Sequence, residues 1–199
     1  HRSVSRGLGD VYKRQVYDFI DSELTNAILI INPLTRSLVF VALGKSKPQL
    51  LQDAKLYVKK LKSPSPPGSK YILKNKQILR KEDDSWFQQI CSDFLLTLLS
   101  PSGKKVEINC EYLSGTEFQK KVWEATKRIP SGTTVSYQSL AKQIGHPTAV
   151  RAVASALARN NIAVIIPCHR VIGITGRMSG FRWGIPLKES LLEREKSLV

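Results

Sequence analysis

The chain has 199 residues, of which 42% are hydrophobic, 31 are Lys or Arg and 16 are Asp or Glu, giving a formal net charge of +15 at pH 7. This length fits one or two small domains with a buried core, and no apolar run reaches the roughly 18 residues that a membrane span needs. So positive a charge favours a polyanionic partner, nucleic acid before an acidic membrane, although a merely soluble basic protein would share it.

The three cysteines, Cys91, Cys110 and Cys168, stand at unrelated spacings. An odd number without a pattern indicates neither a disulfide framework nor a zinc site, and no apolar signal segment begins the chain, so we expect a reduced, intracellular protein. There is no glycine-rich phosphate loop, and His146 and His169 lack ligand spacing to the cysteines. We therefore expect no cofactor and no metal.

Residues 1–15 have no helical or strand period, and the chain's only methionine is Met178. We expect this segment to be a non-native leader outside the fold.

Residues 16–112 predict an N-terminal α+β domain with a small antiparallel sheet. Two apolar runs flank an Asn-Pro turn and predict a hairpin, at 27–31 and 38–43. Apolar residues at helical spacing predict two amphipathic helices, at 48–61 and 83–99. The Pro- and Ser-rich residues between them predict a loop at 62–70, and a short strand is expected at 105–110.

Residues 113–199 predict a mainly helical C-terminal domain. Thr116 and Gln119 have the spacing of a capping box at the start of its first helix. Two short helices then flank a turn that contains Gly and Pro, at 137–144 and 149–159, which indicates a helix-turn-helix. We expect Thr148 to cap the second of these helices. A glycine-spaced loop and a closing helix at 186–196 complete the domain.

The second helix of the pair, with the sequence AVRAVASALAR, has small residues on most of its surface and a lone arginine, Arg151. A thin helix can approach the floor of a DNA groove, and Arg151 could then enter the base stack. Alternatively, the small residues pack tightly on another helix and Arg151 is solvated. The net charge favours DNA binding.

A second unusual feature is the run Pro167-Cys168-His169-Arg170, which interrupts aliphatic residues after an apolar run at 163–166 that predicts a buried strand. A cysteine nucleophile needs thiolate character, which a histidine or arginine promotes. Neighbours in an extended chain point to opposite faces, so His169 would reach the sulfur through a turn at Pro167 or through water. Glu195 is a candidate to orient the imidazole. The alternative is a structural cysteine beside a satisfied histidine.

These residues, with Ser136-Tyr137 and Arg151-Ala152-Val153 upstream, resemble the O6-alkylguanine-DNA alkyltransferases, also called methylated-DNA–protein-cysteine methyltransferases. The resemblance is dense over 115–195 and weaker over 16–61. It implies a ribonuclease-H-like N-terminal domain before a helical domain that holds the site. It also implies that a damaged guanine is flipped out of duplex DNA and that its alkyl group passes irreversibly to Cys168.

The resemblance assigns roles residue by residue. His169 and Glu195 would activate the sulfur, Asn160 would brace the site, and Tyr137 would help to eject the nucleotide and protonate or steady the guanine. Arg151 would fill the vacated stack, and further residues would contact DNA or line the pocket: Thr148, Ala149, Ala152 and Ser155 for DNA, and Leu157, Val171, Phe181 and Arg182 for the pocket.

The sequence departs from many members at Phe181, where a tyrosine is common, and Arg182 and Trp183 enlarge the loop, which predicts a narrower tolerance for bulky alkyl groups. A non-catalytic binder of alkylated DNA or a helix-turn-helix regulator remains the alternative function, and a cysteine hydrolase explains neither the charge nor the thin helix. We expect a monomer that binds double-stranded DNA containing O6-alkylguanine and no membrane, in the nucleus of a eukaryote or the cytoplasm of a bacterium.

Overall fold

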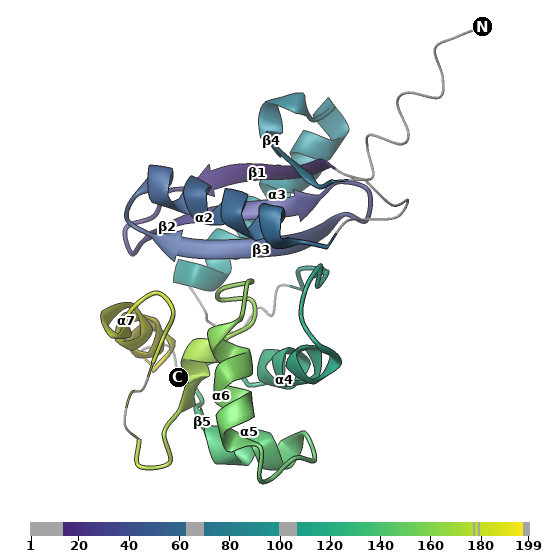
Figure 1. Cartoon of the computed structure of the whole chain (residues 1–199). Helices are drawn as coiled ribbons and strands as arrows, with labels where there is room; N and C mark the ends of the chain where they lie inside the picture. The colour runs from purple at the N-terminus through teal and green to yellow at the C-terminus, as the bar shows by residue number, and fades with distance from the viewer. Residues whose placement is uncertain (1–13, 63–69, 100–106, 177, 179, 197–199) are drawn as a thin grey trace, which may run out of the picture. The chain divides into compact units, whose positions relative to one another are not determined.

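The computed structural model describes residues 14–62, 70–99, 107–176, 178 and 180–196 (Figure 1). Contacts divide the chain into two compact units, the first of His1–Ser92 with Ile108–Ser114 and the second of Asp93–Glu107 with Gly115–Val199. The layout is α+β with two units, as the sequence predicts.

The first unit is built on a four-stranded sheet in the order β3-β2-β1-β4. The bounds are Arg14–Ile20 for β1, Asn26–Asn32 for β2, Ser37–Gly44 for β3 and Ile72–Asn75 for β4. The antiparallel β2–β3 hairpin confirms the prediction. The expectation of a purely antiparallel sheet is wrong, because β4 pairs parallel to β1. A helix, α2 (Lys47–Lys60), precedes β4 in the chain and gives it the length that a parallel connection needs.

The strands β2 and β3 are almost continuously apolar because both faces of the sheet are buried. Ile28 and Ile30 form a cluster with Leu50 of α2, which lies across one face of the sheet (Figure 1). Leu29 and Ile31 alternate with them and point to the opposite face, where they are also fully buried. Burial on both faces replaces the polar alternation of a half-exposed strand.

Three expectations for this unit need correction or fall outside the described residues. Arg14 and Gln15, which we expected to lie in a leader outside the fold, begin β1, and Gln15 is fully buried. Within 107–110 the structure has no named strand, only a bridge from Cys110 to Leu38. Most of the expected loop at 62–70 lies outside the described residues. The predicted second helix is present as α3 (Lys81–Leu99).

The second unit is mainly helical and packs around one apolar cluster. Its elements are α4 (Glu117–Lys127), β5 (Val135–Ser136), α5 (Tyr137–Gln143), α6 (Val150–Ala158), β6 (Val171–Ile172) and α7 (Ile185–Lys196). The predicted capping box of Thr116 and Gln119 is confirmed. The predicted cap by Thr148 is wrong, because α6 begins one residue later, with Ala149 at its N-cap and no side-chain cap.

Candidate functional site

The apolar run before Cys168 forms a tight turn rather than the predicted strand. Val164 adopts a left-handed backbone with φ of 69°, which reverses the chain. Asn160 holds this turn, because its Oδ1 accepts from the Ile162 N–H at 2.8 Å and its Nδ2 donates to the Ile166 carbonyl at 3.0 Å. The prediction of a strand at 163–166 is wrong because a buried turn and a buried strand share the same apolar composition.

The turn delivers Cys168 into the core of the second unit. Cys168–Arg170 form one turn of 3₁₀ helix directly after Pro167, so the chain turns at Pro167, which is one of the two arrangements that the sequence left open. The thiol is only 7% exposed, and its Sγ accepts from Asn160 Nδ2 at 3.3 Å. Burial raises the pKa of Cys168, while that hydrogen bond and the charges of Lys188 and Arg182 act in the opposite direction. The resting group is therefore a thiol.

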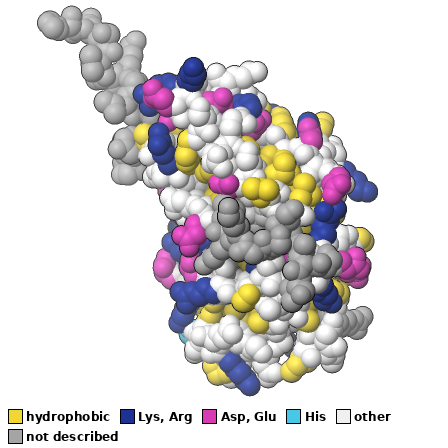
Figure 2. All heavy atoms as spheres, turned by 180° about the vertical axis from the view of Figure 1, so that it is seen from behind, with side chains coloured by type: hydrophobic (Ala, Val, Ile, Leu, Met, Phe, Trp, Pro, Cys, Tyr) yellow, Lys and Arg dark blue, Asp and Glu magenta, His cyan; other side chains and the backbone are white. Residues whose placement is uncertain are grey.

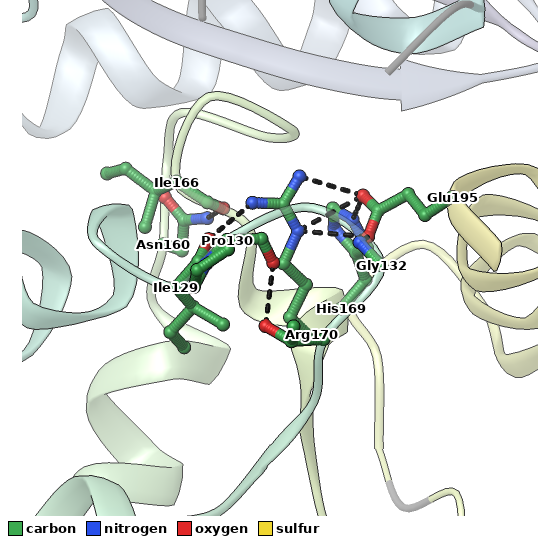
Figure 3. Close-up of polar contacts among 9 residues, drawn as sticks. Ile129, Pro130, Gly132, Asn160, Ile166, His169, Arg170 and Glu195 are labelled. Carbon is green, nitrogen blue, oxygen red and sulfur yellow. Dashed lines mark hydrogen bonds and ion pairs between the residues drawn. The ribbon is translucent and has the colours of Figure 1, made fainter. Parts of the chain in front are cut away.

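The imidazole of His169 is directed by Glu195, which α7 supplies (Figure 3). His169 Nε2 lies 2.8 Å from Glu195 Oε1, and both residues are buried. Burial raises the pKa of Glu195, but hydrogen bonds from His169 and Arg170 outweigh it and lower the pKa to about 2. Glu195 is thus a carboxylate that can only accept, so Nε2 carries the ring proton and, in the neutral ring, Nδ1 carries the lone pair.

The His169 ring is neutral at pH 7. Burial lowers its pKa, Glu195 opposes this shift, and the positive charges of Arg170 and Lys188 reinforce it. Its Nδ1 is buried and has no hydrogen-bond partner among the described residues. An unpaired, neutral imidazole nitrogen on the residue that follows Cys168 is chemically able to take a proton.

The predicted pocket residues gather around the thiol. Leu157, Val171 and Cys168 belong to one buried cluster, and Tyr137 and Phe181 are half-buried against it. Parallel pairing of β5 with β6 explains this, because it joins Val135-Ser136, which precede Tyr137, to Val171-Ile172, which follow the Cys-His-Arg turn. The structure therefore unites residues that are far apart in sequence.

The predicted pocket residue Arg182 is exposed and turns toward the Asn160 turn. Its NH1 donates to the Asn160 carbonyl at 3.0 Å and to Asn161 Oδ1 at 2.9 Å. The loop that carries Phe181 is thereby tied to the residue that holds the thiol.

The predicted DNA contacts lie mainly on the surface of α6 and the turn before it. Arg151, Ala152, Ser155 and Thr148 are exposed, whereas Ala149 is half-buried. Residues 115–199 hold 13 Lys and Arg and 5 Asp and Glu, a formal net charge of +8 (13 − 5). Figure 2 shows Lys and Arg side chains spread over the visible face, with Asp and Glu among them. Charge of this sign suits contact with phosphates.

Sequence reasoning missed Lys188, which is fully buried on α7 and donates from Nζ to the Val171 carbonyl at 2.7 Å. Its signal was present, because Lys188 lies four residues before Leu192 and seven before Glu195, spacings that place all three on one helix face. Burial lowers the pKa of Lys188, and Cys168 opposes that shift.

Over the residues that the structure describes, no cluster of three or more His, Cys, Asp or Glu side chains is arranged to hold a metal ion. The helices in the same described ranges are too short or too polar to cross a membrane.

The buried Glu195 carboxylate predicts a specific acid sensitivity. Its pKa falls from 4.5 to about 2 on folding, so it contributes stability above pH 4.5 that is lost as the pH falls from 4.5 toward 2. A shift of this size corresponds to about 3 kcal/mol. We expect Glu195→Gln to lower the free energy of unfolding by about this amount at pH 7 and to flatten its slope below pH 4.5. Urea unfolding across pH measures both, with the exposed Glu193→Gln as control, and parallel curves for the two proteins would contradict the prediction.

Comparison with known proteins relates this geometry to a family. A family model described as the DNA-binding domain of 6-O-methylguanine DNA methyltransferase matches residues 117–197. The chain is 55% identical to a methylated-DNA–protein-cysteine methyltransferase of Kluyveromyces lactis, over 92% of this chain and 97% of that protein. It is 37% identical to a Saccharomyces cerevisiae protein of the same name, over 90% and 92% of the two chains.

Among solved structures, the chain is similar to Mycobacterium tuberculosis OGT in complex with DNA, with a TM-score of 0.66 and 30% identity over 92% of this chain and 94% of that one. The match extends over both units, and the site described above lies within the segment that the family model covers. The chain belongs to the methylated-DNA–protein-cysteine methyltransferase family.

Proposed function

We propose that this protein repairs DNA by direct reversal, taking the alkyl group of O6-alkylguanine onto Cys168 in a single turnover. The observation that carries this proposal is a buried thiol held by Asn160 beside a neutral, oriented His169. A sulfur nucleophile is well matched to an sp3 alkyl carbon, and the thioether product is stable, so each molecule acts once.

The described residues can account for every proton and bond of the transfer. The Cys168 proton passes to His169 Nδ1, directly or through a water, and Glu195 stabilises the imidazolium that forms. The Sγ–alkyl bond forms as the alkyl–O6 bond breaks, and guanine leaves with that electron pair. Tyr137, at the start of α5, supplies or steadies the proton that guanine gains, and the proton taken from Cys168 balances it. No cofactor or metal enters this scheme.

DNA binding is the task that we assign to α5, the following turn and α6, acting as a helix-turn-helix. The lesion is flipped into the pocket of Leu157, Val171 and Phe181, with Arg182 on the loop beside it, and the exposed Arg151 fills the space left in the stack. Thr148, Ala149, Ala152 and Ser155 follow the DNA surface around it. A ribonuclease-H-like domain (16–112) precedes this domain (113–199).

We infer further that the protein acts as a monomer. Its substrate is genomic DNA, so in a eukaryotic cell, such as the yeasts of the similar proteins, it works in the nucleus, and in a bacterium in the cytoplasm.

The test is a stoichiometric transfer assay. The protein is mixed with a duplex that carries a labelled methyl group on guanine O6, and intact-protein mass is measured with time. We expect a burst of one methyl group per protein molecule and no later turnover. Tight binding of the alkylated duplex without a gain in protein mass would favour the non-catalytic lesion binder, and continued turnover would contradict a single-use acceptor.

A further inference from the structure

Arg170 is the member of the Cys-His-Arg turn to which the proposed reaction gives no role. Its side chain is only 11% exposed. The guanidinium donates from Nε to both Glu195 oxygens at 3.1 and 3.0 Å, and from NH2 to Oε1 at 2.9 Å. Its NH1 donates to the Ile129 carbonyl at 2.6 Å, so the group lies between the end of α4 and α7 (Figure 3).

The Glu195 carboxylate is therefore shared. It accepts from Arg170, from His169 Nε2 and from the Gly132 N–H at 3.2 Å. One negative charge faces one permanent positive charge, and the pair is neutral without any charge on His169. A proton on the imidazole would add a net positive charge to a buried site that already holds Lys188.

Three charged groups act on the imidazole of His169: one carboxylate and two cationic side chains. Glu195 and Lys188 face His169 from α7, and Arg170 faces it from its own turn. Glu195 alone favours the imidazolium, and Arg170 offsets it directly by binding the same carboxylate. Lys188 and Arg182 act on the neighbouring thiol of Cys168.

We propose that Arg170 is a positioning residue that occupies the Glu195 carboxylate and so keeps His169 neutral, with Nδ1 bare to accept the Cys168 proton at physiological pH. The inference depends on the proposed alkyl transfer. In this arrangement Glu195 orients the ring through Nε2 without charging it before the reaction. Arg170 thereby separates the two effects of a carboxylate on a histidine, orientation and protonation.

Removing the guanidinium should change how the transfer rate depends on pH. Without Arg170, Glu195 would stabilise the imidazolium more strongly, and the pKa of His169 would rise. A rise of about one unit leaves about tenfold less neutral imidazole well below that pKa and almost no difference above it. The transfer rate should therefore fall by up to about tenfold at the acidic end of the range and recover to within about twofold at pH 8.5.

The experiment measures single-turnover transfer from a methylated duplex between pH 5.5 and 9 for the wild type, Arg170→Gln and Arg170→Lys. We expect the acidic limb to move to higher pH in Arg170→Gln. A smaller shift in the same direction is expected in Arg170→Lys, whose single ammonium cannot hold both Glu195 oxygens and the Ile129 carbonyl. A rate loss of equal size at every pH, or an unmoved acidic limb in a folded variant, would assign Arg170 a structural role and overturn the proposal.

A second measurement requires neither the alkyl-transfer reaction nor a folded variant, because it uses the wild type alone. Nitrogen NMR of the labelled His169 ring in the wild type should show a proton on Nε2 and a neutral ring at pH 7. An imidazolium at pH 7, or a proton on Nδ1, would refute the proposal. Because this titration does not require transfer, an inactive wild type would count against the proposed function alone, while the ring's protonation would still test the part given to Arg170.

Discussion

Cys168→Ala is expected to abolish alkyl transfer completely while DNA binding persists. Transfer requires a nucleophilic sulfur, and the geometry that prepares one, the Asn160 contact and the neighbouring His169, exists only at Cys168 among the described cysteines. The substitution removes one buried atom and leaves the exposed surface of α6 unchanged, so the affinity for an alkylated duplex should stay within about twofold, with a small loss in stability.

The other two cysteines provide matched controls for that experiment. Burial raises the pKa of Cys91 to about 12, and Asp18 adds to this shift, so its thiolate is not available near neutral pH. Cys110 is half-buried and donates to the Ile108 carbonyl at 3.4 Å. Cys91→Ala and Cys110→Ala should each accept one methyl group per molecule, as the wild type does. Label on Cys168→Ala after digestion, at any position, would show that the acceptor is another residue.

The sequence drew attention to the proposed reacting residues because their chemistry conflicts with their surroundings. A cysteine, a histidine and an arginine among aliphatic residues have no packing purpose, and this conflict can be recognised from the sequence alone. The capping box at Thr116 could also be predicted from the sequence, because it depends on two residues at a fixed local spacing. The partnership of His169 with Glu195 came only from the family resemblance and a general need for a carboxylate, and the structure places the two in contact.

What the sequence did not reveal depends on tertiary contacts. The turn at 163–166 requires a left-handed backbone at Val164, a β-branched residue that rarely adopts it, and the Asn160 side chain stabilises it from outside the segment. The parallel placement of β4 depends on a crossover, which no local pattern encodes. Lys188 lies on the buried face of its helix, but the partner that makes its burial possible, the Val171 carbonyl, is visible only in the structure.

If Arg151 fills the stack after base flipping, its loss should slow repair of duplex DNA but not the reaction with a free base. Arg151 is exposed on α6 between small residues and has room to enter a groove. Extruding a nucleotide costs a few kcal/mol, and a side chain that fills the gap offsets part of that cost. We expect Arg151→Ala to slow repair of O6-methylguanine in duplex DNA by about 100-fold, since each 1.4 kcal/mol corresponds to about tenfold. Reaction with free O6-methylguanine base should change less than about twofold, because nothing is unstacked.

The control for Arg151 is Arg159, a second exposed arginine, at the C-cap of the same helix. Arg159→Ala removes the same charge from the same element, so it reports the general electrostatic share of binding, which added salt should weaken. If Arg151 acts only as a charge, both variants should lose similar duplex activity, and the loss should shrink as salt rises.

If Arg151 fills the stack, Arg151→Ala should lose far more duplex activity than Arg159→Ala at every salt concentration. The loss for Arg151→Ala should be smallest on single-stranded DNA, where the target base has no pairing partner to leave. Equal losses on duplex and free base would exclude the stack-filling role, because a residue that acts only after flipping cannot affect a substrate that needs none.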